Sequence, residues 1–214
     1  MPRRIESLFI DGPAGRLEAL IEEPEDGAIV EAALVCHPHP LHGGTMHNKV
    51  VYRIARGLRR TGSVVLRFNF RGVNLSEGKF AHGKGEIEDA RAALAVLRSR
   101  YPDVPCCLSG FSFGSRVILH IGKELAENPD AVKPVRLIPV GFPTVRGLDI
   151  ELADSTIPRY FVHSTIDEFG PKDEIVNMVA QLQEPKSLTL IDAQDHFFAG
   201  ALPQLEDTIA ALPR

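Results

Sequence analysis

The hydrophobic and polar positions of this chain predict strands and helices that alternate along most of its length. Two short runs, Ile5–Ile10 and Arg16–Glu22, flank a turn sequence rich in Gly and Pro and predict an opening antiparallel hairpin. Apolar runs of strand length follow at regular intervals. The predicted strands after the hairpin are Glu31–Cys36, Ser63–Phe70, Cys106–Ser109, Val135–Val140, Arg159–His163 and Ser187–Ile191.

Between these strands, apolar residues recur every three or four positions, which is the spacing of an amphipathic helix. The predicted helices are Asn48–Arg60, Glu86–Tyr101, a segment through Val117 and Leu125, Asp173–Leu182, and most of the stretch from His196 to Leu212. Such alternation predicts an α/β fold, in which helices cover both faces of a mostly parallel sheet. We expect residues 1–214 to form a single domain, because this length suits one hydrophobic core.

The predicted helix Asn48–Arg60 carries four arginines outside its apolar stripe. They are Arg53, Arg56, Arg59 and Arg60. We expect them to form a solvated face, and a phosphate-binding role is the weaker alternative.

Composition and charge narrow the classes of function. Apolar residues make up 44% of the chain, and charged residues make up 24%, which is typical of a soluble globular protein. The formal net charge of −4 argues against nucleic-acid binding. No apolar run approaches the length of a membrane span. Three cysteines form no disulfide framework, and the first residues lack the apolar core of a signal peptide, so we expect a cytoplasmic protein.

The segment Leu108–Gly114 offers the first candidate chemistry. It contains Gly110-x-Ser112-x-Gly114 between a predicted strand and a predicted helix, which is the context of a nucleophile elbow. In that turn the serine sits at the tip, and glycines let the strand and the helix approach each other. The alternative interpretation is a glycine-rich turn with a solvated serine.

A serine nucleophile needs a base that takes its proton and an acid that orients the base. After Ser112, the chain offers Asp167 and then His196, each shortly after a predicted strand. The carboxyl ends of parallel strands meet at one edge of a sheet, so we predict that these three side chains form a catalytic triad. Rival groups for the acid and base remain. Glu168 and Asp173 are rival acids, whereas Asp195 is expected to be a local cap. His120 and His163 also follow Ser112, but we favour His196 as the base because His120 lies within a predicted helix and His163 within a predicted strand.

An oxyanion hole requires two backbone N–H groups near the serine. Phe113 supplies one at the start of the predicted helix. The second is expected from the loop 37–44, where prolines exclude two positions, and we favour His39 over Leu41.

The same loop raises the alternative of a metal site. It carries His37, His39 and His42, with His47 close behind. Their spacing lacks a metalloprotease helix pattern, and no carboxylate lies among them. We therefore expect neither a metal nor another cofactor.

Taken together, these segments resemble the α/β-hydrolase superfamily, and more narrowly the small bacterial serine hydrolases related to dienelactone hydrolases. The segments that carry the resemblance span most of the chain. They are Cys36–Met46, Arg67–Gly72, Gly85–Asp89, Gly110–Gly114 and Asp195–Phe198. The family's nucleophile, acid and base fall on Ser112, Asp167 and His196. Asn74 and the pair Ser164-Thr165 depart from the usual pattern, which affects only the expected pocket rim.

The resemblance implies hydrolysis of a carboxylic ester through an acyl-enzyme, and the serine nucleophile places the chain nearer the esterases than the cysteine-dependent dienelactone hydrolases. The connector Gly141–Pro158 is too short for a lid domain, so we expect small or short-chain acyl groups. A thioesterase, amidase or peptidase with the same triad is an alternative, and so is a non-catalytic binding scaffold. The expected partner is a small-molecule ester, with no nucleic acid and no membrane; the sequence predicts no oligomeric state.

Overall fold

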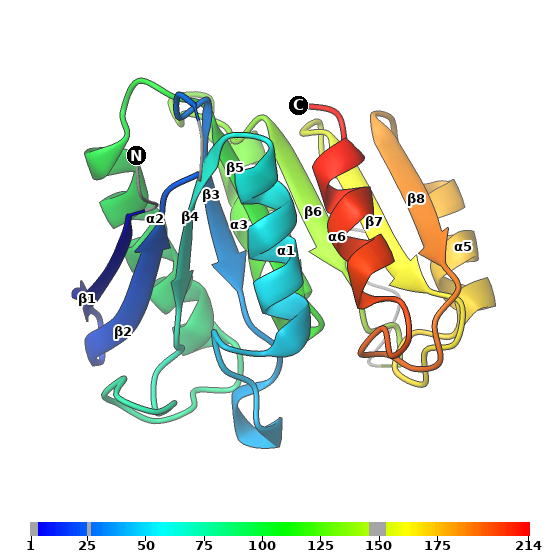
Figure 1. Ribbon diagram of the computed structural model, residues 1–214, viewed down its shortest axis with the longest axis horizontal. Coiled ribbons are helices and arrows are strands. Elements are labelled where there is room, and N and C mark those ends of the chain that lie inside the picture. Colours follow the sequence, from blue (N-terminus) through cyan, green and yellow to red (C-terminus); the bar gives the residue numbers. More distant parts are fainter. Residues whose placement is uncertain (1–3, 25–26, 146–152) are drawn as a thin grey trace.

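The computed structural model describes residues 4–24, 27–145 and 153–214, which build an eight-stranded sheet covered by helices (Figure 1). The strands are β1 Ile5–Gly12, β2 Gly15–Glu22, β3 Glu31–Cys36, β4 Ser63–Phe68, β5 Cys106–Phe111, β6 Arg136–Val140, β7 Arg159–Ser164 and β8 Lys186–Ile191. The helices are η1 Pro40–His42, α1 Lys49–Arg60, α2 Lys84–Arg100, α3 Phe113–Glu127, α5 Lys172–Gln181 and α6 Leu202–Ala211.

The sheet has the strand order β1-β2-β4-β3-β5-β6-β7-β8. Strands β1 and β2 form the opening hairpin, and β2 runs antiparallel to β4, whereas the pairs from β4 to β8 are parallel. The predicted α/β class, the mostly parallel sheet and the opening hairpin are confirmed. In the sheet, β3 lies between β4 and β5. The chain passes from β3 to β4 on one side of β3 and later returns to form β5 on its other side. This reversal creates a crevice at the carboxyl ends of β3 and β5, where ligands bind in such sheets.

The central strands β3, β4 and β5 are buried along their whole length. Alternate residues of each strand enter two different cores, because successive side chains point to opposite faces. Cys106 packs into the core under α2, α3 and α5, whereas Cys107 packs into the core under α1 and α6. Figure 1 shows these two groups of helices on opposite faces of the sheet. Both neighbouring cysteines are buried free thiols.

Several boundaries differ from the predicted ones. Strand β4 ends at Phe68, two residues before the predicted end, because the backbone N–H of Phe70 turns away from the sheet and donates to His37 Nε2. Helix α6 spans Leu202–Ala211, so the stretch from His196 to Leu212 is mostly helical as predicted, but the helix begins only at Leu202. Positive φ angles at Phe198 and Gly200 interrupt any helix there.

The prediction of a solvated arginine face on α1 is wrong in one position. Arg59 is buried and lies 3.6 Å from the buried carboxylate of Glu22 on β2. The other three arginines are partly exposed, but they converge on Glu206 of α6, at 2.8 to 3.4 Å. The helix face therefore ties α1 to its neighbours. Sequence spacing could not reveal this, because both carboxylates are distant in the chain.

A second buried ion pair joins the loop after β4 to α2. The Arg71 guanidinium donates to both carboxylate oxygens of Asp89, at 2.6 to 3.1 Å, and the Asp89 side chain is fully buried. Asp89 also accepts the backbone N–H of Arg71. Removing the carboxylate leaves a largely buried guanidinium without its partner.

We expect Asp89→Ala to lower the free energy of unfolding by about 3–5 kcal/mol, because it leaves a buried charge unpaired. Glu88→Ala is the matched control. Glu88 precedes Asp89 on the same helix and pairs with Arg91 at an exposed site, where loss of a pair costs about 0–1 kcal/mol. Urea unfolding of both variants measures the difference, and equal small losses would contradict the structural role of Asp89.

Candidate active site

The serine of the Gly-x-Ser-x-Gly motif lies at a sharp turn between β5 and α3. Ser112 has φ 54° and ψ −115°, and it forms the N-cap of α3. A non-glycine residue in such a conformation costs about 1–3 kcal/mol, and the surrounding structure must hold it in place. The N–H of Ser112 donates to Val140 O at 2.9 Å, and its carbonyl accepts from Ser115 N and Oγ.

The two glycines of the motif are required by close backbone contacts. A Cβ on Gly110 would lie 2.3 Å from the carbonyl oxygen of Gly114, and a Cβ on Gly114 would lie 2.4 Å from that of Cys36. The second contact presses the elbow against the end of β3. The loop that follows β3 is therefore held beside the serine.

The two candidates for the second oxyanion donor, His39 and Leu41, have different environments in the loop after β3. His39 and Phe113 both line the cavity beside Ser112, and their rings lie 5.1 Å apart. Leu41 is 66% exposed, and its N–H donates to His39 Nδ1 at 3.2 Å within the loop. Phe113 is the first residue of α3, where backbone N–H groups lack partners within the helix. This arrangement favours His39 over Leu41 as the second donor.

The loops after β7 and β8 bring an aspartate and a histidine together. Asp167 Oδ2 lies 2.7 Å from His196 Nδ1, and both side chains are buried. An ionised carboxylate can only accept a hydrogen bond, so Nδ1 carries the proton and donates a hydrogen bond to Asp167. The imidazole ring is held between aromatic neighbours. It stacks on Phe111 at 4.8 Å and meets Phe169 edge-on at 4.9 Å.

The carboxylate of Asp167 has further donors. Its Oδ1 accepts the backbone N–H groups of Phe169 and Gly170 at 2.8 and 2.9 Å. Burial raises the pKa of Asp167, but the hydrogen bond and charge of His196, the charge of His163 and the Phe169 N–H lower it more, so the net pKa lies below its ordinary value. The carboxylate is thus kept ionised.

His163 is a buried neighbour of this pair that the sequence placed only within a strand. Its Nε2 donates to Gly170 O at 2.6 Å and lies 3.3 Å from Asp167 Oδ2. Burial lowers the pKa of His163. His163 contacts Asp167 but is not among the described residues that line the cavity with Ser112, whereas His196 is.

The rival acids contact other groups. Glu168 accepts the backbone N–H of His196 at 3.3 Å, and Asp173 is exposed in the first turn of α5. Asp195 accepts the N–H of Ala199 at 2.9 Å, as expected of a local cap. Of these carboxylates, Asp167 is the one in contact with the imidazole nitrogen.

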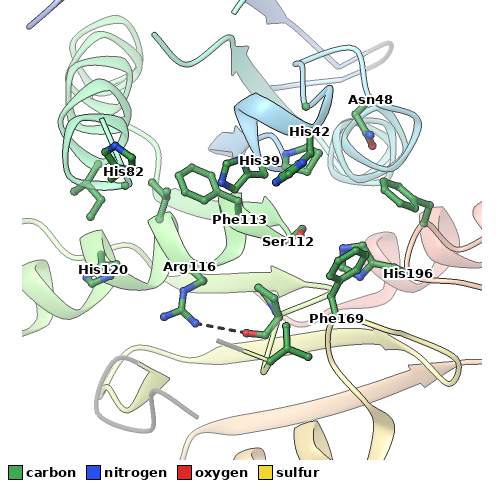
Figure 2. A pocket seen from close by; sticks show the side chains of 18 of the residues that line it. His39, His42, Asn48, His82, Ser112, Phe113, Arg116, His120, Phe169 and His196 are labelled. Carbon is green, nitrogen blue, oxygen red and sulfur yellow. Dashed lines mark hydrogen bonds between the residues drawn. The ribbon is translucent and has the colours of Figure 1, made fainter. Parts of the chain in front are cut away.

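Ser112 and His196 line one cavity of about 860 Å³ (Figure 2). The described hydrogen bonds contain none between Ser112 Oγ and His196; catalytic hydrogen bonds often tighten only when substrate binds. The cavity is lined by Pro38, His39, His42, Gly44, Asn48, His82, Gly83, Lys84, Ile87, Ser112, Phe113, Arg116, Val117, His120, Pro143, Val145, Phe169, His196 and Phe197.

The histidines of the loop after β3 have separate environments. His37 is fully buried, donates from Nδ1 to Pro38 O at 2.6 Å, and accepts the N–H of Phe70 at Nε2. Both ring nitrogens are used, so His37 shapes the loop. His39 and His42 line the cavity, whereas His47 is exposed. Within the described part of the chain, no three His, Cys, Asp or Glu side chains gather as metal ligands.

The segment Arg67–Gly72 forms hydrogen bonds with Met46, which follows the loop after β3. This supporting role was not predicted from the sequence. Arg67 Nη1 donates to Met46 O at 2.6 Å, and Asn69 Oδ1 accepts the N–H of Met46 at 2.8 Å. Arg67 and Asn69 alternate with phenylalanines in the predicted strand, and this pattern could have indicated the role, because a buried polar group needs a hydrogen-bond partner.

The sequence is similar to a known family and to a known protein. Residues 37–141 match a family described as serine aminopeptidase, S33. An uncharacterized protein of Rickettsia prowazekii is 36% identical over 200 residues, which cover 89% of this chain and 81% of the relative. The matched family segment contains the loop after β3 and the elbow.

Solved structures of α/β serine hydrolases are similar to this chain in both fold and sequence. An α/β serine hydrolase homologue from Coxiella burnetii has a TM-score of 0.88 and 34% identity, covering 96% of this chain and 95% of that one. The chain belongs to the α/β-hydrolase superfamily. Another member, from Xanthomonas campestris and described as lacking a lid, is also 34% identical, with a TM-score of 0.85 and coverage of 98% and 93%. The narrower resemblance to dienelactone hydrolases stays a prediction.

This α/β hydrolase has no helix in its described residues that combines the length and the apolar character needed to cross a membrane.

Burial lowers the pKa of His37 to about 3, which predicts a pH-dependent stability. The unfolded chain binds a proton there below about pH 6.5, whereas the folded hydrolase does not until about pH 3, so stability falls as the pH drops through this range. We expect this site to account for about 2 kcal/mol of lost stability between pH 7 and pH 5.

The variant His37→Gln keeps a donor and an acceptor but cannot titrate. Urea unfolding at pH 7 and pH 5 should show a smaller loss in this variant than in the wild type. The same loss in both proteins would contradict the assignment, whatever the absolute stability of the variant.

Proposed function

We propose that the protein hydrolyses small or short-chain carboxylic esters through an acyl-enzyme on Ser112. The observation that carries the proposal is the 2.7 Å contact between Asp167 and His196 beside the cavity that Ser112 lines. It fixes the imidazole tautomer with its proton on Nδ1. The other nitrogen, Nε2, is then able to accept a proton.

In the proposed first step, Ser112 Oγ attacks the ester carbonyl carbon while His196 Nε2 takes the hydroxyl proton. Asp167 stabilises the imidazolium that results. The N–H groups of Phe113 and His39 bind the developing oxyanion, a contribution of about 3–4 kcal/mol per donor to the barrier in such sites. His196 returns the proton to the departing alkoxide, which leaves as an alcohol.

In the second step, His196 takes a proton from water, and the hydroxide attacks the acyl-enzyme. The acid is released when the bond to Ser112 Oγ breaks and the serine regains its proton. No cofactor is needed to balance either step. Short acyl groups fit the proposal because the connector between β6 and β7, residues 141–158, is too short to build a separate lid domain.

The family description raises aminopeptidase activity as a second candidate. An aminopeptidase must bind the protonated amine of its substrate, for which a carboxylate is the natural partner. Among the described residues that line the cavity, none is Asp or Glu. This lining favours an ester over a peptide with a free amino terminus. An unreactive Ser112 would instead indicate a binding protein that uses the fold as a non-catalytic scaffold.

We expect wild-type protein to react with a fluorophosphonate probe and to cleave a short p-nitrophenyl ester. Ser112→Ala should lose labelling, and its kcat should fall by at least about 10³-fold, because the nucleophile is absent. Ser99→Ala is the control, since this serine is exposed on α2 and lies outside the cavity lining. Labelling without turnover would indicate another substrate class. Absence of labelling in folded protein would support the scaffold.

We expect Asp167→Asn to lower kcat by about 10²–10⁴-fold, because an amide can hold the imidazole in the wrong tautomer. Asp195→Asn is the matched control, since Asp195 adjoins His196 in the chain but caps the N–H of Ala199. Steady-state kinetics with the same ester measures both. An equal loss in the two variants would contradict the assignment of Asp167 as the acid.

A further inference from the structure

The described part of the cavity lining beside Ser112 carries two cationic side chains, although the chain as a whole is acidic. Acidic residues outnumber Lys and Arg by 28 to 24 in the sequence, and the formal net charge is −4. The described cavity lining nevertheless includes Lys84 and Arg116 and no carboxylate. Five imidazoles also line the cavity as hydrogen-bonding groups. They belong to His39, His42, His82, His120 and His196. A cleft lined by one sign of charge attracts ligands of the other sign.

Helix α3 aligns part of this charge with the nucleophile. Ser112, Arg116 and His120 are spaced four residues apart, so they share one face of the helix, and all three line the cavity. Side chains at this spacing have Cβ atoms about 6 Å apart. Figure 2 shows Arg116 and His120 on the side of Ser112 away from His196. The guanidinium therefore belongs to the substrate cavity, one helical turn from the reacting serine.

Contacts with the β6–β7 connector hold Arg116 in place. Its Nη1 donates to Pro143 O at 3.5 Å, and its guanidinium lies over the Phe142 ring, 5.5 Å from the centroid. A planar guanidinium matches a carboxylate or a phosphate with paired donors.

The start of α2 supplies the second positive charge. Lys84 is the first residue of α2 and is exposed at the cavity, next to His82 in a left-handed conformation with φ 53°. The carboxylate in this turn, Glu86, is buried and accepts the N–H groups of Ala81 and Gly83 at 2.8 and 2.7 Å. The Glu86 carboxylate is therefore bonded to loop backbone, and Lys84 is the cationic side chain that this turn contributes to the cavity lining.

We propose that the substrate is an ester that carries a negatively charged group, a carboxylate or a phosphate, a few bonds from the reacting carbonyl. Arg116 binds this group, and Lys84 attracts it at the mouth of the cavity. This inference rests on the proposed esterase function and specifies its substrate class. Arg116 acts as a specificity-determining residue one turn from the nucleophile.

Matched esters test the proposal by pH-stat titration. Ethyl valerate, monoethyl glutarate and ethyl 4-(phosphonooxy)butyrate differ only in the group that ends the acyl chain, which is methyl, carboxylate or phosphate. Butyl acetate and 4-acetoxybutyrate place the same contrast on the alcohol side. We expect kcat/KM for an anionic ester to exceed that of its neutral match by about 10- to 100-fold at low salt. The preference should shrink in 0.5 M NaCl, because the Debye length falls from about 30 Å in dilute buffer to about 4 Å at this salt concentration.

Variants assign the preference to a residue. The ratio of anionic to neutral kcat/KM should fall by about 10-fold in Arg116→Gln and stay at the wild-type value in Lys123→Gln. Lys123 lies on the same helix, pairs with Glu127 and is outside the cavity lining. A persistent preference in Arg116→Gln, or a ratio near one in wild type for both series, would overturn the proposal.

Fluorophosphonate labelling separates this failure from failure of the esterase function. A protein that labels at Ser112 but shows no anionic preference retains the proposed chemistry and loses the substrate class. If no ester is cleaved, glutarate at rising concentration should slow labelling of the wild type more than of Arg116→Gln. Equal labelling rates in that experiment would also overturn the proposal.

Discussion

The backbone contact between the elbow and the end of β3 is the constraint on which the candidate site depends. A Cβ at Gly114 would lie 2.4 Å from Cys36 O, so only glycine allows this approach. The contact sits at the reversal of strand order, where the loops after β3 and β5 separate to opposite sides. It brings Ser112, the N–H of Phe113 and the His39 loop to one cavity. The strained backbone of Ser112 is held by the same packing.

Parallel pairing supplies the other half of the site. Strands β7 and β8 end at the same edge of the sheet as β5, so the loops that follow them meet beside the elbow. Burial penalises a charged carboxylate there, and Asp167 is stabilised by two backbone N–H groups and by His196. The ionised aspartate in turn fixes the imidazole. The proposed base is therefore oriented by a group whose own position depends on local backbone donors.

Patterns within short segments predicted much of this molecule. Hydrophobic periodicity predicted the order of strands and helices, and the glycine spacing predicted the elbow around Ser112. The predictions were wrong where a distant partner decided the outcome. Arg59 is buried because Glu22, on another element, lies 3.6 Å away. Strand β4 ends early because Phe70 donates to His37. The late start of α6 has a local cause instead, because Phe198 and Gly200 adopt positive φ angles.

By itself, the sequence determined the alternating architecture, the chain order of Ser112, Asp167 and His196, and the glycines that a sharp elbow needs. These features follow from local conformational preference and from side-chain periodicity. Only the tertiary structure decided that Asp167 rather than Glu168 meets the imidazole, and that Lys84 and Arg116, from two different helices, line the same cavity as Ser112. Such contacts join loops that lie far apart in the chain. Their geometry is set by strand pairing and core packing, which no short stretch of sequence contains.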